Sequence, residues 1–324
     1  MKVAIFGLGS IGRRHARCFR EAGATELVGM DPMPGRRAQF VEEIGADAVA
    51  TEAEALALGP DLVVVASPNI FHVRQATLAA EAGRALFVEK PLGVDLVEAE
   101  ALANLVSERG LYLHMGSNWK FHPAFVLMKK LLAEGAIGKP TGGQALAGQW
   151  LPDWHPYEDY RRMYAARADL GGGAIFDTHE IDYLTWLLGP VAQLLGMKTQ
   201  SGSLEIETED VAACVLRFQS GALVTLLTDY IQRTPRRRYH ISGDGGTVEW
   251  DFHAGELTLC KPGERFAERH DVRLADVNDM YVAQARHVLD DIRLGRAPVT
   301  GVAHALDVLR LQTAWRAETP VDRR

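Results

Sequence analysis

A glycine-rich turn near the start of the chain links a short apolar run to a helix-forming run. The apolar run covers residues 3–6, the turn covers residues 7–12 with the sequence GLGSIG, and the helix-forming run covers residues 13–21. A strand, a Gly-x-Gly-x-x-Gly turn and a helix in this order are typical of a dinucleotide-binding unit. The flanking pattern matters, because a glycine turn alone is common. The sequence therefore predicts a dinucleotide cofactor bound at this turn.

Each glycine of the turn has its own physical reason. Gly7 allows the sharp turn, Gly9 lets a pyrophosphate approach the backbone without a Cβ clash, and Gly12 lets the helix pack close to the strand. The pyrophosphate then lies on the free N–H groups and the positive dipole end of the helix. The predicted cofactor contacts of the turn are Gly7, Gly9, Ser10, Ile11 and Gly12.

The first part of the chain alternates apolar runs with helix-forming stretches. The further strand-like runs cover residues 27–30, 62–66, 85–88 and 111–115, and helix-forming stretches at 34–44, 70–82 and 95–109 separate them. Strands that are apolar throughout and are separated by helices imply a parallel sheet covered on both faces. We expect an α/β fold, with a doubly wound Rossmann-type NAD(P)-binding domain over residues 1–119.

The pattern changes after about residue 120. Helices are predicted over 123–134 and 174–188, with an irregular aromatic segment at 150–169 between them. From residue 191 to about residue 271 the chain is predicted to form an open, largely antiparallel sheet, and helices return at 277–294 and 304–316. We therefore expect a second, α+β domain over residues 120–324 that binds the substrate.

Composition limits the partners of the chain. Its 324 residues fit two domains, and its formal net charge of −7 disfavours nucleic acid and anionic membrane surfaces. Cys18, Cys214 and Cys260 lie far apart in sequence and offer neither a disulfide framework nor a metal-ligand cluster. No apolar run approaches the roughly 18 residues that span a bilayer, and the strand at residue 2 leaves no room for a signal peptide. We expect a cytoplasmic protein with no metal site.

An acidic residue follows the second predicted strand. Asp31 lies about 20 residues beyond the glycine turn, where the dinucleotide fingerprint expects a carboxylate that accepts from the ribose hydroxyls. A carboxylate at this position repels a 2′-phosphate, so NAD is favoured over NADP. Arg36 and Arg37 follow closely and could turn towards a phosphate, but a solvated helix face explains them more simply.

Two loops follow strands that are predicted to end at the same edge of the sheet. Ligands of open α/β sheets bind at the carboxyl ends of the strands. Lys90 is placed there as a cation that can polarise a substrate hydroxyl or carbonyl, and Pro91 fixes the turn after it. For His72 a structural role is at least as plausible as a catalytic one. The predicted cofactor contacts of the two loops are Ser67, Pro68, Asn69, His72, Glu89 and Lys90.

Taken together, these features resemble the Gfo/Idh/MocA oxidoreductase family, the relatives of glucose–fructose oxidoreductase and inositol dehydrogenase. The resemblance rests on the glycine turn, Glu89-Lys90-Pro91, the triple glycine at 171–173 with His179 after it, and the late segment 239–248. It spans nearly the whole chain. It implies NAD(P)-dependent oxidation or reduction of sugars, cyclitols or related polyols. It also implies a homodimer or homotetramer formed through the C-terminal sheet.

The resemblance implies His179 as the general acid/base, because family members usually carry a histidine in the helix after the triple glycine. Imidazole titrates near neutrality and can take a hydroxyl proton. Many relatives place an aspartate four residues before this histidine, whereas Asp177 lies only two residues before it. Either Asp177 caps a helix that begins after it, or Asp182 orients the imidazole, and Glu180 stays open as a third candidate. A packing histidine at a helix start is the simpler alternative for His179.

Two regions are candidates for substrate contacts. One follows the last Rossmann strand, where the family often has Asn-x-Arg and this chain has lysine in place of the arginine. The other is the aromatic segment, whose ring faces and hydrogen-bonding groups suit a sugar. A surface loop or an oligomer contact explains that segment equally well. The predicted substrate contacts are Asn118, Lys120, Trp150, Trp154, His155 and Tyr160.

A basic run, Arg236-Arg237-Arg238, stands in a predicted strand. Alternation along a strand places Arg237 on the opposite face from its two neighbours. The run fits a phosphate or a carboxylate of a substrate, but a charged sheet face or salt bridges between subunits explain it better.

The sequence thus predicts an NAD-dependent dehydrogenase or reductase for a sugar-like secondary alcohol or ketone. In this interpretation Lys90 polarises the reacting oxygen, and His179 exchanges its proton with help from Asp177 or Asp182. An imine or enone reductase on the same scaffold is one alternative. A non-catalytic protein that senses NAD(P) is another, although a sensor needs neither Lys90 nor His179.

Overall fold

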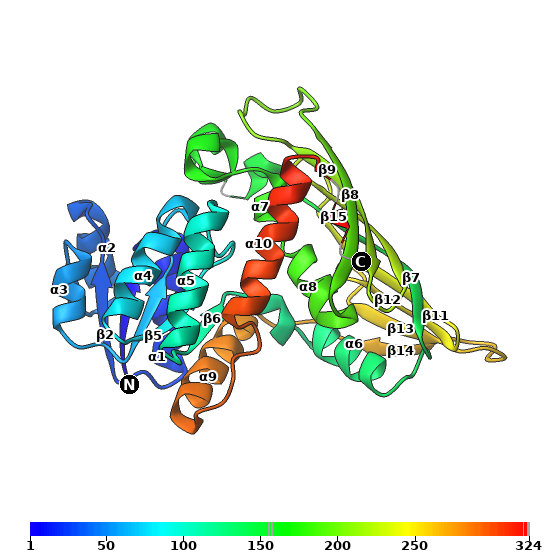
Figure 1. Ribbon diagram of the computed structural model, residues 1–324, viewed down its shortest axis with the longest axis horizontal. Coiled ribbons are helices and arrows are strands. Elements are labelled where there is room, and N and C mark those ends of the chain that lie inside the picture. The colour runs from blue at the N-terminus through cyan, green and yellow to red at the C-terminus, as the bar shows by residue number, and fades with distance from the viewer. Residues whose placement is uncertain (155, 157, 320, 323–324) are drawn as a thin grey trace. The chain divides into compact units, whose positions relative to one another are not determined.

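The computed structural model describes residues 1–154, 156, 158–319 and 321–322. They form two compact units, each assembled from two stretches of the chain. The first unit contains Met1–Phe121 and Asp276–Leu309, and the second contains His122–Ala275 and Arg310–Arg324. Each unit has its own β-sheet and its own helices (Figure 1).

The first unit is built on a parallel sheet. Within the described residues this sheet has 6 strands in the order β3-β2-β1-β4-β5-β6. The chain builds the sheet outwards from β1 to β3 on one side and then returns to add β4, β5 and β6 on the other side of β1. The order confirms the predicted doubly wound Rossmann fold. The strands are β1 (Lys2–Phe6), β2 (Glu26–Met30), β3 (Ala48–Val49), β4 (Leu62–Val65), β5 (Ala85–Val88) and β6 (Leu113–Met115).

Helices connect the strands of this sheet. Their starts follow local capping chemistry: the Asp95 side chain accepts from the backbone N–H of Glu98, and Thr51 forms a capping box with Glu54. The helices are α1 (Ser10–Glu21), α2 (Pro34–Ile44), α3 (Glu52–Ala57), α4 (His72–Glu81) and α5 (Leu96–Glu108), with the 3-10 turns η1 (Asn69–Phe71) and η2 (Asn118–Phe121).

A late helix also belongs to the first unit, which differs from the predicted ranges of 1–119 and 120–324. Helix α9 (Asn278–Leu294) buries Val282, Ala285 and Leu289 in the same core as Phe19 and Phe87. The sequence predicted a helix over 277–294 but not its partner, which lies far away in the sequence. Helix α10 (Val302–Arg316) begins in residues of the first unit and ends in residues of the second.

The second unit is built on a large mixed sheet. Among the described residues it has 9 strands in the order β14-β13-β12-β11-β7-β10-β9-β8-β15. The β7–β10 pair is parallel, and the other pairs are antiparallel, which confirms the predicted open, largely antiparallel sheet. The strands are β7 (Pro140–Gly148), β8 (Val191–Thr199), β9 (Val211–Phe218), β10 (Leu223–Asp229), β11 (Arg236–Gly243), β12 (Gly246–Asp251), β13 (Glu256–Cys260), β14 (Glu268–Asp271) and β15 (Val321–Asp322).

Strand β7 was not predicted, because it is rich in glycine. It pairs with β10 on one side and β11 on the other. A Cβ on Gly143 would come within 2.6 Å of the carbonyl oxygen of His240, so a close approach of neighbouring backbone requires glycine there. Tertiary packing thus overrides the low strand propensity of this segment.

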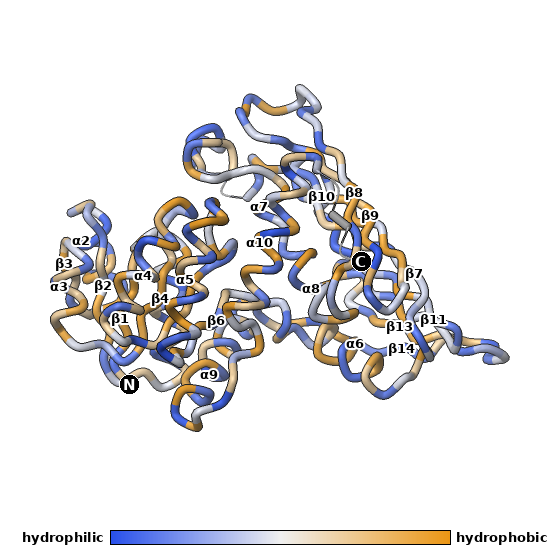
Figure 2. Tube along the Cα trace, in the orientation of Figure 1, coloured by the Kyte–Doolittle hydropathy of each residue, from blue (hydrophilic) through white to orange (hydrophobic). Residues whose placement is uncertain are grey.

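Helices cover one face of this sheet. Helix α6 (Pro123–Ala133) packs on α8 (Glu180–Leu188), and α7 (Ala174–Asp177) packs on β9 and β10. Burial alternates strictly along β9, and the hydrophobic colour runs along β8 and β9 in Figure 2. The other face leaves apolar side chains in solvent, with Leu195 58% and Met197 74% exposed.

The single helix predicted over 174–188 is two helices. Helix α7 ends at Asp177, Thr178 is extended with φ −67° and ψ 140°, and α8 starts after His179. The Thr178 hydroxyl donates to the Glu180 carboxylate at 2.6 Å and accepts from the Glu180 N–H at 3.4 Å, a local bonding pattern that competes with helix. Asp177 therefore does not cap α8, and His179 occupies that position.

Candidate active site, in two parts

The glycine turn has the geometry that its sequence predicts. Gly7 has φ +87°, and a Cβ there would lie 2.6 Å from the backbone nitrogen of Ser67. A Cβ on Gly12 would lie 1.9 Å from the carbonyl oxygen of Gly7, so α1 packs directly against the turn. At Gly9 a Cβ would meet nothing within 4 Å. The fold itself therefore requires glycine at positions 7 and 12. At Gly9 the fold would accept a side chain, so the open space there is available to a ligand.

The N-terminus of α1 is free to receive an anion. Gly9 occupies the N-cap position and supplies no side-chain hydrogen bond to the first turn. Ser10 is exposed and Ile11 is partly buried. A helix of 12 residues with an uncapped first turn offers backbone N–H groups and a positive dipole end, which fits the pyrophosphate of a dinucleotide.

Asp31 lies next to the turn and is held in place. It is 2% exposed; its Oδ2 accepts from the N–H of Leu8 at 2.9 Å, and its Oδ1 accepts from the N–H of Met33 at 2.9 Å. Arg36 lies 3.5 Å from Oδ2, and Arg37 donates to the carbonyl oxygen of Asp31 at 2.7 Å. The structure thus brings the carboxylate and the glycine turn together, as a ribose-binding acid requires.

His72 bridges two strand-end loops. Its Nδ1 lies 2.8 Å from the carbonyl oxygen of Pro91, and its Nε2 lies 2.8 Å from the carbonyl oxygen of Ser67. Burial lowers the pKa of His72, so the neutral ring donates to one of the two carbonyls. The Ser67 hydroxyl donates to Gln75, and Asn69 is buried in η1. The imidazole therefore joins the loops that carry Ser67 and Lys90, which indicates a positioning role.

Glu89 and Lys90 directly follow β5. Burial raises the pKa of Glu89, but the hydrogen bond from His15 and the charges of His15 and Lys90 lower it further than burial raises it, so the carboxylate stays ionised. The Glu89 carboxylate also accepts from the backbone N–H of Lys90 at 3.1 Å. Lys90 is partly buried, and the Lys90–Pro91 peptide is cis. The sequence analysis did not predict the contact between His15 and Glu89, although His15 lies about one helical turn after the glycine turn.

The predicted substrate residues after β6 are buried inside the first unit. Asn118 is 6% exposed and Lys120 is 3% exposed. The Lys120 ammonium donates to the Thr300 hydroxyl at 2.7 Å, and Thr300 also bonds the Ser117 hydroxyl at 2.9 Å. Lys120 thus ties η2 to the segment before α10, which gives it a structural contact that the sequence did not predict.

In the second unit, Asp177 receives hydrogen bonds from tyrosines. The Tyr164 hydroxyl donates at 2.6 Å and the Tyr230 hydroxyl donates at 2.9 Å, to the two carboxylate oxygens. Burial, followed by the charge of Asp177, raises the pKa of Tyr230 well above its usual value, so this hydroxyl keeps its proton and remains a donor. Asp177 thus connects α7 with the residue that follows β10 and with the segment before the triple glycine.

His179 contacts a tyrosine that lies one turn further along the chain. Its Nδ1 lies 2.9 Å from the hydroxyl of Tyr183, and the two rings stack with centroids 5.5 Å apart and an interplanar angle of 12°. The spacing i, i+4 is the one that brings side chains together on a helix. Our sequence interpretation considered carboxylates alone as partners of His179, so it missed Tyr183. Asp182 is buried, with 4% exposure.

Glu180 forms a buried ion pair with the basic run. Its carboxylate lies 2.9 Å from the Arg237 guanidinium and also accepts from the backbone N–H of His179 at 3.1 Å. Glu180 is fully buried, whereas the Arg237 side chain is 16% exposed. Arg238 lies on the other face and pairs with Asp251, as strand alternation predicts. Arg237 is therefore an internal partner of Glu180, which leaves little of the basic run for a substrate anion.

The aromatic segment forms short 3-10 turns, η3 (Leu151–Asp153), η4 (Tyr160–Arg162), η5 (Tyr164–Ala166) and η6 (Ala168–Leu170). Trp150 stacks under the Arg233 guanidinium at 3.5 Å, Trp154 packs edge-on against Tyr230 at 5.3 Å, and the Tyr160 hydroxyl accepts from the Glu205 N–H at 3.3 Å. These three rings pack around Leu151 and Ala165 in a small core. His155, also predicted to contact substrate, lies outside the described residues.

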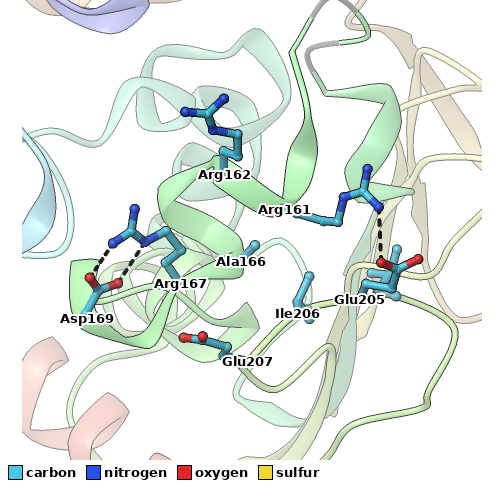
Figure 3. Close-up of a pocket in the computed structure, with 9 residues that line it drawn as sticks. Arg161, Arg162, Ala166, Arg167, Asp169, Glu205, Ile206 and Glu207 are labelled. Carbon is cyan, nitrogen blue, oxygen red and sulfur yellow. Dashed lines mark hydrogen bonds and ion pairs between the residues drawn. The ribbon is translucent and has the colours of Figure 1, made fainter.

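A polar pocket of about 750 Å³ lies beside this segment (Figure 3). Arg161 pairs with Glu205 at 3.1 Å, and Arg167 pairs with Asp169, while the Arg162 guanidinium points away from both pairs in Figure 3. The paired arginines have their charge met by carboxylates. The pocket is therefore a weak candidate for an anionic substrate. Among the described residues, no group of three or more His, Cys, Asp or Glu side chains is arranged to hold a metal ion.

The Rossmann sheet, the open glycine turn and the anchored Asp31 define a dinucleotide-binding protein with a separate sheet unit. Residues 1–117 match the model of the oxidoreductase family with an NAD-binding Rossmann fold, and residues 125–249 match the model of the GFO/IDH/MocA C-terminal domain. This chain belongs to the GFO/IDH/MocA family of NAD-binding oxidoreductases. The match confirms the family and the cofactor that the sequence predicted.

Named relatives cover nearly the whole chain. The scyllo-inositol 2-dehydrogenase (NAD(+)) of Bacillus subtilis (strain 168) is 33% identical over 318 residues, covering 92% of this chain and 88% of that protein. The myo-inositol 2-dehydrogenase of Thermotoga maritima is 25% identical and covers 92% of this chain and 90% of that protein. A solved levoglucosan dehydrogenase in complex with NADH and levoglucosan has a TM-score of 0.90 at 18% identity, covering 100% of this chain and 99% of the other. This last likeness shows the fold.

Proposed function

We propose that this protein is an NAD-dependent dehydrogenase that interconverts a secondary alcohol and a ketone on a sugar, cyclitol or sugar derivative. The observation that carries the proposal is the partly buried imidazole of His179 at the start of α8, whose Nδ1 lies 2.9 Å from the hydroxyl of Tyr183. The names of the relatives, inositol dehydrogenases among them, support the substrate class.

The proposed roles follow from the chemistry of the side chains. The bound nicotinamide supplies hydride acceptance or donation. The glycine turn and α1 hold the pyrophosphate, and Asp31 accepts from the adenosine ribose. The Lys90 ammonium polarises the reacting oxygen, and His179 takes the hydroxyl proton in oxidation and returns it in reduction. Asp177 holds the backbone before His179 through its bonds to Tyr164 and Tyr230.

The first experiment is a screen of inositols, sugars, sugar acids and nucleotide sugars, with NAD and NADP, following absorbance of the reduced cofactor. With an active substrate in hand, His179→Ala is expected to lower kcat about 10²- to 10⁴-fold. The affinity for NADH should not change. His253→Ala, in an exposed turn after β12, is the matched control. Full kcat in His179→Ala at saturating substrate would overturn the acid/base role.

A second experiment addresses the choice of NAD. Asp31→Ser removes the carboxylate and leaves Arg36 without the partner that lies 3.5 Å away. The ratio of kcat/KM for NADPH over NADH is expected to rise by at least about tenfold, since one lost charge interaction of about 1.4 kcal/mol is a factor of ten. In the double variant Asp31→Ser, Arg36→Met this ratio should not rise, because the Arg36 guanidinium that would bind the 2′-phosphate is then gone. An unchanged ratio in Asp31→Ser would show that Asp31 does not select NAD.

We also propose that the open face of the nine-stranded sheet joins copies of this chain. The face carries a hollow of about 1150 Å³, lined by Leu195, Met197 and Val215 among others. Contiguous exposed apolar surface of this kind marks protein interfaces. Met197→Glu with Leu195→Glu should shift the mass in analytical ultracentrifugation towards a monomer, whereas Val97→Glu, at an exposed position of α5, should not. A monomeric wild type would contradict this proposal.

We also propose that the protein works in the cytoplasm. Cys18, Cys214 and Cys260 are free thiols, and burial raises the pKa of Cys18 to about 11. Free, scattered cysteines are typical of proteins that work in the reducing cytoplasm. In the described residues, no helix combines the length and apolarity needed to cross a bilayer. Cell fractionation with an antibody against the native protein tests the location.

A further inference from the structure

The hydroxyl of Tyr183 is fixed where it meets one nitrogen of His179. Tyr183 is fully buried, and its ring packs against Phe125 with centroids 5.0 Å apart. The same ring stacks on the imidazole of His179 at 5.5 Å, and its hydroxyl oxygen lies 2.9 Å from Nδ1. The tyrosine therefore determines both the plane of the imidazole and the hydrogen bond of Nδ1.

We propose that Tyr183 is a positioning residue that fixes the tautomer of His179. This inference rests on the proposed acid/base role of His179. The Tyr183 oxygen accepts the Nδ1–H, so the lone pair of Nε2 is the one that exchanges a proton. In oxidation the O–H bond of the substrate breaks as an Nε2–H bond forms, and in reduction the same proton returns to oxygen. The Nδ1–H bond persists in both directions.

A neutral partner suits this exchange better than a carboxylate. A carboxylate at Nδ1 favours the imidazolium and would hold the proton on the ring, whereas a hydroxyl oxygen fixes the tautomer with a smaller bias towards the charged form. The flanking carboxylates are engaged elsewhere: Asp177 receives two tyrosine hydroxyls, and Glu180 pairs with Arg237. Tyr183 is thus the side chain that meets Nδ1 of His179, a place where the sequence interpretation expected a carboxylate.

The kinetic test uses two matched tyrosine variants. Tyr183→Phe removes one oxygen atom and keeps the ring that packs on Phe125. Tyr239→Phe is the control, since Tyr239 packs on the same Phe125 at 5.1 Å and its buried hydroxyl has no hydrogen-bond partner among the described residues. We expect Tyr183→Phe to lower kcat roughly 10- to 100-fold, a part of what positioned acid–base catalysis contributes, with substrate KM nearly unchanged. Tyr239→Phe should keep the wild-type kcat.

A spectroscopic test reads the tautomer without any turnover. Protein labelled with ¹⁵N-histidine gives separate Nδ1 and Nε2 signals, and the His179 signals are those missing in His179→Ala. We expect Nδ1 to carry the proton of the neutral ring in the wild type and in Tyr239→Phe. In Tyr183→Phe the Nδ1–H population should fall. A wild-type ring with its proton on Nε2, or a tautomer unchanged in Tyr183→Phe, overturns the inference.

The two tests separate the inference from the proposed function. If His179→Ala retains kcat, the acid/base role fails, while the tautomer measurement still decides what Tyr183 does to the ring. If His179→Ala is inactive and Tyr183→Phe has the wild-type kcat and tautomer, the function stands and the positioning role fails. Melting curves of both phenylalanine variants that match the wild type exclude misfolding as the cause of a lower kcat.

Discussion

The imidazole of His15 and the carboxylate of Glu89 lie 2.5 Å apart, measured from Nε2 to Oε1. His15 belongs to α1, whose first turn is the proposed pyrophosphate site, and Glu89 precedes Lys90 in the loop that follows β5. His15 is 1% exposed and packs edge-on against Phe87 at 4.9 Å. The pair therefore joins the cofactor helix to the loop that carries the proposed catalytic lysine.

Glu89→Gln is expected to reduce stability near neutrality. Gln keeps an acceptor for His15 but loses the charge, so the free energy of unfolding should fall by about 1–2 kcal/mol at pH 7. Because the pKa of Glu89 is lowered below its usual 4.5, the carboxylate stabilises the fold above that pH, and this contribution is lost as the pH falls through the lower value. The variant should therefore lose less stability than the wild type on acidification.

Urea unfolding followed by circular dichroism, at pH 7 and at pH 4, measures both effects. Glu26→Gln is the control, because Glu26 is an exposed partner of Lys2 in the same sheet and surface pairs contribute little. If Glu89→Gln and Glu26→Gln give the same small change at both pH values, the buried pair does not hold the two elements together.

Gly9→Ala should separate cofactor binding from folding. A Cβ at Gly9 meets nothing within 4 Å among the described residues, so the fold accepts it, but the methyl group occupies the space proposed for the pyrophosphate. We expect the Kd for NADH, measured by fluorescence titration, to rise by at least about tenfold, or about 1.4 kcal/mol. Gly35→Ala, an equally open position in α2, should bind NADH as the wild type does. Equal affinity in the two variants would show that the phosphates lie elsewhere.

Gly12→Ala, unlike Gly9→Ala, should impair folding itself. Its Cβ would lie 1.9 Å from a backbone oxygen of Gly7, which cannot move without displacing β1 or α1. We expect loss of cooperative folding of the first unit, read by circular dichroism, since overpacking against backbone is poorly tolerated. A stable Gly12→Ala protein would mean that α1 can shift away from the sheet.

Most strands and helices of the first unit were predictable because their signals are local, although the place of α9 was not. The helix over 34–44 and the strand over 85–88 match α2 and β5, because a proline start, an apolar run and flanking glycines lie within a few residues. Asp31 was predictable because the spacing from the glycine turn places it at the end of β2. By contrast, His15 and Glu89 are 74 residues apart, and no periodicity signals their contact.

The surroundings of Asp177 and His179 in the second unit were hard to predict for a different reason. The pattern over 174–188 fits one helix, in which Asp177 and His179 would point apart. The break at Thr178 depends on the Thr178–Glu180 hydrogen bonds and on the tyrosines that hold Asp177, which come from distant segments. Tyr183 was within reach of sequence reasoning, since it stands four residues after His179 on a helix. It was missed because its hydroxyl, and not a carboxylate, meets the ring.

Because of His122, we expect the folded protein to lose stability on mild acidification. It caps α6 by accepting the Ala124 N–H at Nδ1, at 3.0 Å, and protonation of Nδ1 would remove that acceptor. Burial, with a smaller effect of Arg237, lowers the pKa of His122 from 6.5 to about 4. The unfolded chain therefore takes up a proton below pH 6.5 that the folded chain does not, so this contribution to stability falls between pH 6.5 and pH 4.

His122→Asn keeps a good N-cap and removes the titration. At pH 4.5 its advantage over the wild type, relative to pH 7, should be about 1–2 kcal/mol after allowance for solvent screening. Tryptophan fluorescence in urea suits the measurement, since 5 of the 6 tryptophans lie in the second unit. Burial lowers the pKa of His72 equally in both proteins, so its effect cancels in the comparison. Parallel pH profiles of the two proteins would contradict the prediction.

Arg237→Met should be strongly destabilising, whereas Arg238→Met should not. Arg237 is the cation 2.9 Å from the fully buried Glu180, and removal of one partner of a buried pair costs about 3–5 kcal/mol. Arg238 lies on the opposite face of β11 with its side chain 53% exposed, and loss of such a surface pair costs less than about 1 kcal/mol. Urea unfolding read by tryptophan fluorescence compares the two variants. Arg237→Met combined with Glu180→Gln should recover part of the loss, because no unpaired charge then remains buried; equal losses in the two single variants would mean that Glu180 finds another cation or water.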